Sequence, residues 1–294
     1  RMKAIGAFSV KSYNQPRREQ RQQVIQAARE LGMSVYPEGG STFFHNMTMI
    51  LDGHTGVEHN IPVAPLYNDV VQLWKASETG YTPTLIVNYG ANSGEYYWYQ
   101  KTNVWDKERL LRFTPRNIID GRARRVTMVP DEEYENGHIL TSKSCKKLAD
   151  EGVKVNLGGH GQLQGLGAHW ELWMLAQGGM SNLEALRAAT LNGAEYIGMG
   201  KEIGSLEAGK LADLIVLDQN PLENIQHTEH VRYTMVNGRL FDAETMDEVG
   251  NYNRKTGKFF FNEPTYSGSV DAESHSHGRT DGIAGHECSC FMRH

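Results

Sequence analysis

The sequence predicts an α/β fold in which short parallel strands alternate with helices, followed by a smaller antiparallel β region. Over the first 220 of its 294 residues, a short apolar run, a glycine or polar turn and an amphipathic stretch repeat in that order. This alternation is typical of βα units with right-handed crossovers, which build either a barrel or an open doubly wound sheet. Near Lys210 the alternation ends, and strand-like segments joined by the turn signal Asn237-Gly238 replace it.

Local patterns define the elements of the first half. A helix is predicted over residues 16–31, because Pro16 suits a first helical turn, Ala28 and Leu31 share one face, and Gly32 ends the pattern. Short apolar runs predict strands at residues 4–10, 34–36, 55–57, 84–87 and 154–157, and a second helix is predicted over residues 66–77.

The stretch from residue 89 to residue 130 is long for a connection between two such elements and is rich in Tyr, Trp and Arg. Four consecutive aromatic residues, Tyr96 to Tyr99, do not fit one face of a helix or a strand. Two interpretations stay open. In the first, the insertion forms a lid or a substrate wall, as long insertions often do. In the second, it is a loop packed under its own aromatic side chains.

The C-terminal third has clearer signals. Ser181 and Glu184 have the spacing of a capping box, which predicts a helix over residues 183–190. Residues 213–217 read as a strand. The hairpin is predicted from residues 231–236 and 239–241, either side of the Asn-Gly turn. From residue 263 onward Gly, Ser, His and Asp dominate, so residues 263–294 are expected to be a flexible tail.

Composition excludes several classes of function. The formal net charge of −5 is small for this size and argues against a nucleic-acid surface or a basic membrane patch, because either would need clustered Lys and Arg. No apolar run reaches the roughly 18 residues that a membrane-spanning helix needs. The first ten residues lack a secretory-signal pattern, but we interpret Arg1 as a cut, so the compartment stays open. Cys288 and Cys290 form a C-x-C pair in the tail, which is weak evidence for a metal site.

Polar residues stand at or just after five predicted strands. They are Lys11, Glu38, His59, Asn88 and His160. In a parallel barrel the carboxyl ends of the strands share one mouth, and active groups lie there. A single histidine at a strand end is more often a hydrogen-bonded structural residue. Four residue types with metal-binding capacity at successive strand ends instead indicate a site for a divalent ion.

Three segments carry a resemblance to a known family. The block 153–165 with Ala168-His169-Trp170-Glu171-Leu172 resembles the last barrel strand of amidohydrolase-superfamily proteins. Residues 184–190 with Asn192-Gly-Ala are similar to the helix that follows that strand. Residues 204–218 with Asn220-Pro221 resemble the return into the small β domain. Within the superfamily, the chain looks most similar to the imidazolonepropionase-like and prolidase-like group, and more narrowly to the amidohydrolase domain found fused behind a β-propeller.

The resemblance implies a partial TIM-type (β/α)8 metal-dependent hydrolase barrel with part of a small C-terminal β-sandwich domain. The expected division is barrel strands four to eight in residues 1–209, the small β domain in residues 210–262 and the tail after them. The first three barrel strands are expected to lie outside this chain. An exposed barrel edge would favour a homo-oligomer or pairing with an upstream domain of the same protein.

The resemblance also implies a set of metal ligands, most simply for zinc as one or two ions. Lys11 matches the strand-four lysine, which is often carbamylated and then offers two anionic oxygens. Glu38 stands where the family usually has a histidine, and His59 matches the strand-six histidine. His160 stands where the family has an aspartate that takes the proton of the attacking water. Imidazole can accept a proton or bind a metal, but it brings no negative charge.

Four further residues are candidates for substrate contacts: Asn88, Tyr89, His54 and His169. The family's His-x-His pair has no counterpart upstream of Lys11. His275-Ser-His277 in the tail has the spacing but the wrong context, so we do not assign it as a ligand pair.

The leading hypothesis is hydrolysis of an amide, cyclic amide or peptide-like C–N bond by a metal-activated water, with His160 moving the proton. The substrate would be a small molecule or peptide-like. The alternative is a catalytically inactive barrel that serves as a binding or scaffolding module, which the replacements at Glu38 and His160 favour. A nucleotide-binding sheet is excluded, because no G-x-G-x-x-G or P-loop follows a strand.

Overall fold

A computed structural model of the chain describes residues 1–13, 15–123 and 128–262. The helices that cover the strands and the core are, in chain order, α1 (Arg18–Glu30), α2 (Phe43–Asp52), α3 (Asn68–Ser77), α4 (Gly94–Lys101), α8 (Leu140–Asp150) and α9 (Leu166–Gln177). Further helices are α5 (Glu108–Phe113), α6 (Arg116–Ala123), α7 (Asp131–Tyr134), α10 (Asn182–Ala188) and α11 (Leu191–Tyr196). Among the described residues, none of the helices is both long and apolar enough to cross a bilayer.

Four short parallel strands form an arc that positions the candidate site. They are β1 (Ser9–Ser12), β2 (Ser34–Pro37), β3 (Gly56–Glu58) and β4 (Gly80–Thr82). β1 pairs with β2 and β3 with β4. Parallel bridges join Glu38 to Glu58 and Tyr81 to Val155, so the pairs and the segment around Val155 are continuous. Within the described residues no bridge joins Val155 back to β1, and the arc is open.

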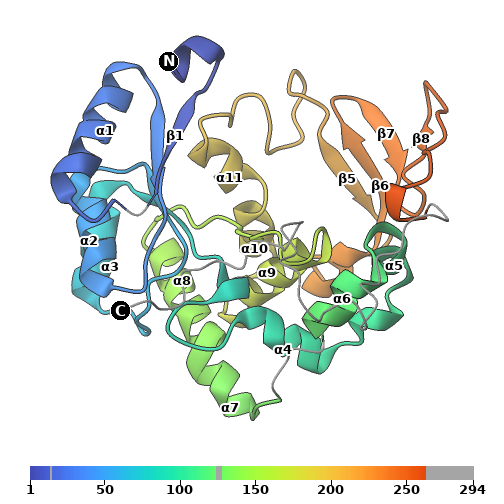
Figure 1. Ribbon diagram of the computed structural model, residues 1–294, viewed down its shortest axis with the longest axis horizontal. Helices are drawn as coiled ribbons and strands as arrows, with labels where there is room; N and C mark the ends of the chain where they lie inside the picture. The colour runs from blue at the N-terminus through green and yellow to red at the C-terminus, as the bar shows by residue number, and fades with distance from the viewer. Residues whose placement is uncertain (14, 124–127, 263–294) are drawn as a thin grey trace, which may run out of the picture.

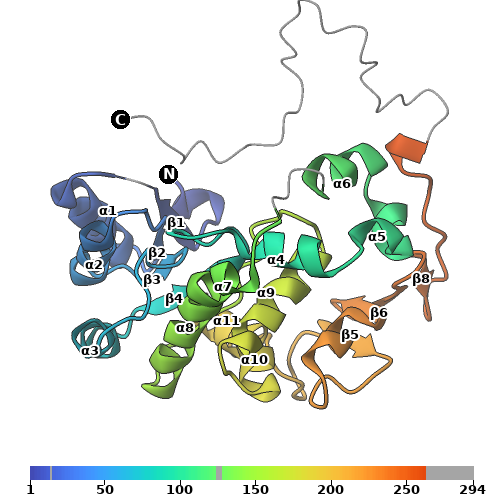
Figure 2. The ribbon, with the colours of Figure 1, turned by 90° about the horizontal axis from the view of Figure 1, so that it is seen from below.

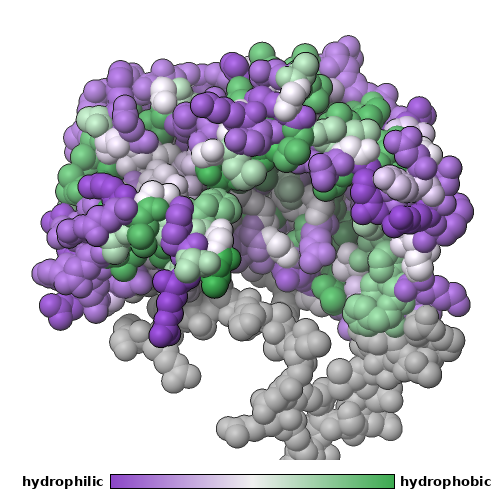
Figure 3. Space-filling model, turned by 90° about the horizontal axis from the view of Figure 1, so that it is seen from above, coloured by the Kyte–Doolittle hydropathy of each residue, from purple (hydrophilic) through white to green (hydrophobic). Residues whose placement is uncertain are grey.

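A four-stranded antiparallel sheet lies at the opposite end of the molecule from α1 to α3 (Figures 1 and 2). Its strands, in spatial order, are β5 (Leu214–Leu217), β6 (Val231–Val236), β7 (Arg239–Asp242) and β8 (Glu248–Val249). β6 and β7 pair as the predicted hairpin, with Val236 opposite Arg239 and Asn237 at a φ of 48°. Seen from above, the molecule is hollowed between the part that carries α1 and the part that carries this sheet (Figure 3).

The main core lies where the helices cover the arc. Trp74 of α3 is completely buried and packs at a tilt against Tyr81 of β4, with 4.6 Å between ring centroids. Its indole N–H donates to the carbonyl of Thr79 at 2.7 Å. On the far side, Trp98 of α4 packs against Trp170 and Trp173 of α9. Burying a large aromatic ring removes 150–250 Å² from water, roughly 4–6 kcal/mol at 25 cal/mol per Å². These contacts therefore fix the helices against the strand ends.

Three predicted elements differ in the structure. Residues 84–87 are not a strand: Leu85–Val87 is a 3-10 turn, η2, and the strand β4 lies just before it. The carboxyl group of Glu171 in α9 accepts hydrogen bonds from the N–H groups of Leu85 and Ile86 at 2.8 and 2.9 Å. It therefore pairs the backbone N–H groups at the start of the turn, as a capping side chain does at the start of a helix. The local sequence pattern could not predict this turn, because Glu171 lies more than 80 residues further along the chain. The segment 154–157 forms only the bridge at Val155.

The N-terminal strand is also shorter than predicted. A 3-10 turn, η1 (Lys3–Ile5), precedes β1, and Lys11 lies within the strand rather than after it. The predicted helices are present as α1 and α3, and the capping box of α10 forms as predicted, with Ser181 accepting from the Glu184 N–H. Small one-turn helical segments complete the fold: η3 (Val104–Asp106), η4 (Glu135–Ile139), η5 (Ile225–Glu229) and η6 (Phe260–Asn262).

The aromatic insertion is helical rather than a loop. Residues 89–130 include α4, η3, α5 and α6. Tyr96 to Tyr99 do lie on one helix, because α4 is enclosed on more than one side: Trp98 and Tyr99 are both buried against Trp170. The predicted tail at residues 263–294 lies outside the described residues, and the division of the chain at residues 209 and 262 stays a prediction.

Candidate active site

Three of the predicted ligand residues converge at the carboxyl ends of adjacent strands. Glu38 follows β2 and His59 follows β3, and Lys11 projects from β1 beside them. The ammonium group of Lys11 lies 2.6 Å from one Glu38 carboxylate oxygen, and the Nε2 atom of His59 lies 2.8 Å from the other. Glu38 and His59 are almost completely buried, whereas the Lys11 side chain is exposed. Parallel pairing brings these residues together, because the carboxyl ends of parallel strands lie along the same edge.

His160 joins this cluster from the segment after Val155. Its ring packs edge-on against the ring of His59, with 5.1 Å between centroids. Both residues have a positive φ, 70° at His59 and 50° at His160. Residues other than glycine rarely adopt this conformation, and each such residue costs on the order of 1–3 kcal/mol and is concentrated at functional sites. The two histidines therefore share a strained backbone as well as a common location.

The ring of Tyr89 also contacts His59. The rings stack at 4.9 Å with an interplanar angle of 28°. The side chain of Asn60 fixes the Tyr89 backbone, because its Oδ1 accepts the Tyr89 N–H at 2.6 Å and its Nδ2 donates to the Tyr89 carbonyl at 2.9 Å. Sequence reasoning missed Asn60. The only feature of the sequence that could have indicated Asn60 is its position directly after His59 at the end of a strand.

Asn88 is buried beside Tyr89 and has unused hydrogen-bonding capacity. The side chain is 2% exposed, and within the described residues neither its Oδ1 nor its Nδ2 atom has a partner. The same holds for Asn156 and for the Nδ1 atom of His59. A buried polar group without a hydrogen bond costs about 1–3 kcal/mol. Unpaired groups gathered around one cluster are typical of a site that completes its contacts with a ligand.

The other two predicted substrate residues lie elsewhere. His54 precedes β3, at the opposite end of the strand from His59, and its Nδ1 atom bonds to the carbonyl of Met49 at 2.9 Å. His169 lies in the first turns of α9, near Trp173. It lines a groove of about 1220 Å³ between α5, α9 and the β5–β8 sheet. The structure brings neither residue to the cluster of Lys11, Glu38, His59 and His160, which we term the mouth cluster.

The mouth cluster keeps its carboxylate ionised. Burial alone would raise the pKa of Glu38, but the hydrogen bonds from His59 and Lys11 lower this pKa to about 2. Burial lowers the pKa of His160, which favours its neutral imidazole near pH 7. Neutral imidazole next to a fixed carboxylate is a combination suited to accepting a proton.

A second carboxyl, Glu58, stands directly behind the cluster. Burial raises its pKa, and the hydroxyl of Tyr196 donates to its Oε1 atom at 2.7 Å. The Tyr196 ring from α11 fits against Gly56 and Gly80: a Cβ atom at either glycine would lie within 2.4 Å of the ring or its hydroxyl. Tyr196 was not predicted, because its role depends on two glycines more than 100 residues earlier in the chain.

The donor chemistry of the mouth cluster fits a divalent ion, since it combines a carboxylate, two imidazoles and a lysine that can carry a carbamate. In the structure these side chains contact one another as hydrogen-bonded partners, with Lys11 and His59 each on one oxygen of Glu38. Among the residues that the structure describes, no three or more His, Cys, Asp or Glu side chains form a group spaced to hold a metal.

Comparisons with known proteins agree with the α/β fold. The sequence model of the amidohydrolase family matches residues 117–241. Ochratoxinase of Aspergillus niger is 30% identical over 166 residues, which are 53% of this chain and 35% of that protein. Imidazolonepropionase of a Geobacillus species is 45% identical over 67 residues, 22% of this chain and 16% of that one.

Solved structures show the same fold. A crystal structure of a Xaa-Pro dipeptidase with methionine bound in its active site aligns with a TM-score of 0.57 and 23% identity, covering 82% of this chain and 56% of that one. In sequence the chain is related to the amidohydrolase superfamily, through the family match and the similarity to ochratoxinase. It spans about a third of the length of the ochratoxinase that it matches.

Proposed function

We propose that this chain contributes the catalytic mouth of a hydrolase that cleaves an amide, cyclic amide or peptide-like C–N bond in a small substrate. The observation that carries the proposal is the convergence of Lys11, Glu38, His59 and His160, two of them with a left-handed backbone. The relationship to the superfamily supports the reaction class. The relatives named ochratoxinase, imidazolonepropionase and Xaa-Pro dipeptidase support a small or peptide-like substrate.

A divalent ion, for which zinc suits the donors, would be held by Glu38, His59, His160 and a carbamylated Lys11, and when bound it supplies a polarised carbonyl and a water of lowered pKa. The chain itself supplies the proton path. Where the other three residues hold the ion, the neutral His160 ring accepts the proton of the attacking water and returns it to the leaving nitrogen as the C–N bond breaks. A His160 ring that binds the ion has no lone pair left for this step. Glu38 is held by His59 and, while the amine is not carbamylated, by the Lys11 ammonium group. It provides negative charge in the same cluster as the imidazolium that forms.

Two residues of the mouth would contact substrate. Asn88 offers an unpaired amide that can both donate to a carbonyl and accept from an amide N–H. Tyr89, stacked on His59 and fixed by Asn60, offers an aromatic wall for an apolar group. His54 and His169 are not included, because the structure places them away from this mouth.

A second function remains open because no described group of three or more carboxylate, thiol or imidazole side chains is spaced for a metal. In that case the barrel is an inactive binding module, and the mouth cluster is a hydrogen-bonded structural unit. The two proposals make opposite predictions about metal uptake and turnover.

The deciding experiment combines metal content with turnover. Protein purified without chelator is analysed for metals and assayed with Xaa-Pro dipeptides, N-acyl amino acids and lactams. We expect one or two zinc ions per chain and hydrolysis of at least one class, both lost in His59→Ala and His160→Ala. His227→Ala is the matched control, since that histidine is half-buried on η5 and lies outside the mouth cluster. A folded protein that binds no zinc and hydrolyses nothing supports the scaffold.

A further inference from the structure

A chain of two hydrogen bonds runs from the mouth cluster into the interior. The Nδ1 atom of His160 lies 3.2 Å from the Oε1 atom of Gln162. The Nε2 atom of Gln162 donates to the Oε1 atom of Glu95 at 3.3 Å. Glu95 lies in the first turn of α4, and its side chain is 7% exposed. The exposed histidine is thus connected to a buried carboxyl that no part of the proposed reaction uses.

The direction of these bonds follows from the chemistry of the three groups. An ionised carboxylate only accepts hydrogen bonds, so the amide of Gln162 must turn its NH₂ group toward Glu95. Its carbonyl oxygen then faces His160, and this oxygen can bond to Nδ1 only if Nδ1 carries the proton. In a neutral imidazole the Nε2 atom is then unprotonated. Free neutral histidine prefers the opposite form, with the proton on Nε2.

Glu95 has few other contacts that would explain its burial. Within the described residues its Oε2 atom is buried without a hydrogen-bond partner. Burial raises the pKa of its carboxyl, and the Gln162 hydrogen bond and the charge of Arg122 offset only part of that rise. A half-satisfied carboxyl destabilises the fold relative to an apolar residue. A role in orienting Gln162 accounts for its presence at this point.

We propose that Glu95 and Gln162 are positioning residues that hold His160 in the Nδ1–H tautomer and leave its Nε2 lone pair free. The consequence for catalysis rests on the proposed function: only an unprotonated Nε2 accepts the water proton or binds a divalent ion. Metal-binding histidines commonly donate their other ring N–H to such a partner, and loss of the partner lowers metal affinity by roughly 10–100-fold.

The tautomer can be measured directly in the full chain. Protein labelled with ¹⁵N-histidine is examined at pH 8 by long-range ¹H–¹⁵N correlation of the imidazole rings, with His160 assigned from the signals missing in His160→Gln. We expect the Nδ1–H pattern in the native chain. In Glu95→Met, and equally in Gln162→Leu, we expect the Nε2–H form to become the major species.

Two control variants separate positioning from folding. Glu95→Gln keeps an acceptor oxygen for Gln162, so it should restore the Nδ1–H form. Gln164→Leu changes an exposed glutamine two residues along the same segment and should leave the tautomer unchanged. Gln162 is only half-buried, so Gln162→Leu keeps the test open if Glu95→Met does not fold.

The outcomes distinguish this inference from the proposed function. An Nε2–H ring in the native chain, or an Nδ1–H ring that persists in both Glu95→Met and Gln162→Leu, overturns the positioning role whatever the activity. A switched tautomer supports it even if no substrate is hydrolysed. Zinc affinity, measured by competition with a chromophoric chelator, should fall by roughly 10–100-fold in Gln162→Leu and stay constant in Gln164→Leu.

Discussion

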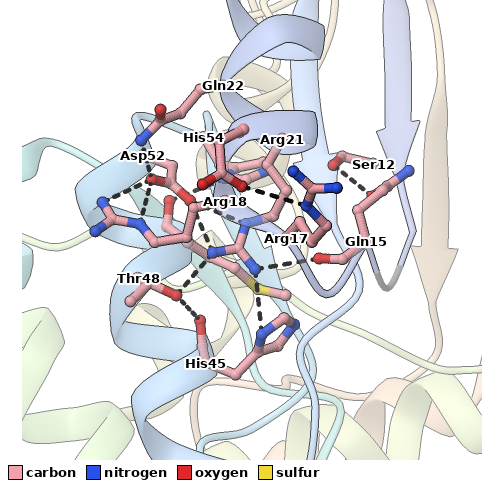
Figure 4. A network of polar contacts seen from close by, with 12 residues as sticks. Ser12, Gln15, Arg17, Arg18, Arg21, Gln22, His45, Thr48, Asp52 and His54 are labelled. Atoms are coloured by element: carbon pink, nitrogen blue, oxygen red, sulfur yellow. Dashed lines mark hydrogen bonds and ion pairs between the residues drawn. The ribbon is translucent and has the colours of Figure 1, made fainter.

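Two polar clusters in this chain use similar residue types in opposite ways. The first joins α1 and α2 around Arg21, whose side chain is completely buried (Figure 4). The guanidinium of Arg21 bonds to Asp52, Thr48 and the Gln15 carbonyl, at distances from 2.8 to 3.2 Å. Asp52 also accepts hydrogen bonds from Arg18 and Gln22.

The second is the mouth cluster with its neighbours, where several buried polar atoms have no partner within the described residues. Asn88, Asn156 and the Nδ1 atom of His59 are the examples. Buried polar groups that are fully paired fix a fold, whereas unpaired ones weaken it and are kept where a ligand pairs with them. Around Arg21 the Nε2 atom of His54 is also unpaired, but the charged groups at the centre of that cluster are all paired. The comparison teaches that the pairing of the central groups, rather than residue type, separates the structural cluster from the candidate site.

The largest effect is expected from breaking the saturated cluster. Arg21→Met should lower the free energy of unfolding by about 3–5 kcal/mol, because it leaves the buried Asp52 carboxylate with fewer positive partners. The measurement is urea unfolding followed by circular dichroism. The matched control is Arg232→Met, which breaks the exposed Arg232–Asp218 pair and should change stability by less than about 1 kcal/mol. Equal losses in the two variants would contradict the assignment of Arg21 as a buried anchor.

A pH effect is expected from Glu171, which holds the turn η2 just before Asn88. Burial raises the pKa of Glu171 to about 8, although the N–H groups of Leu85 and Ile86 offset part of the rise. Between its ordinary pKa near 4.5 and pH 8 the folded chain holds a proton that the unfolded chain has released. Stability should therefore fall as pH rises through this window, by at most about 1.4 kcal/mol per pH unit.

Chemical unfolding at a series of pH values measures this slope. Glu171→Gln has no titrating proton at this position and should flatten it, whatever its own stability. Glu132→Gln is the control, because Glu132 is exposed on α7 and should leave the slope as it is. A slope that survives in Glu171→Gln would assign the titration to another group.

A smaller change of the opposite sign is expected in the mouth. Asn88→Leu removes two unpaired polar atoms without breaking a hydrogen bond, so the free energy of unfolding should rise by about 1 kcal/mol. Hydrolysis by the intact site should fall, since the substrate loses a polar contact. Thermal unfolding and kcat/KM, measured on the same preparation, test both parts. If Asn88→Leu is destabilised as Arg21→Met is, the mouth is no less saturated than the α1–α2 cluster.

The smallest expected effect is self-association of the unmodified chain. The described arc is open at β1, and an open strand edge presents N–H and C=O groups that a second chain can pair with. Light scattering should therefore give a mass above the 33.0 kDa of one chain, increasing with concentration. A constant monomer mass would show that the edge is protected.

Much of the fold was predictable because its signals are local. The capping box at Ser181, the hairpin at Asn237-Gly238 and the helices α1 and α3 depend on residues within a few positions of each other. The strand-end positions of Glu38 and His59 were equally predictable, since parallel strands expose their last residues at one edge. The fate of residues 84–87 was not, because Glu171 decides it from a helix far along the chain.

By itself the sequence determined the α/β class, the relationship to the superfamily and the residues that stand at the mouth, since periodicity, turns and motifs are properties of neighbouring residues. Only the tertiary structure decided which of them meet. It brought Lys11, Glu38, His59 and His160 together, directed His54 and His169 elsewhere, and added Asn60, Glu95 and Tyr196. The physical reason is that hydrogen-bond saturation and burial depend on contacts between distant segments, which no local pattern contains.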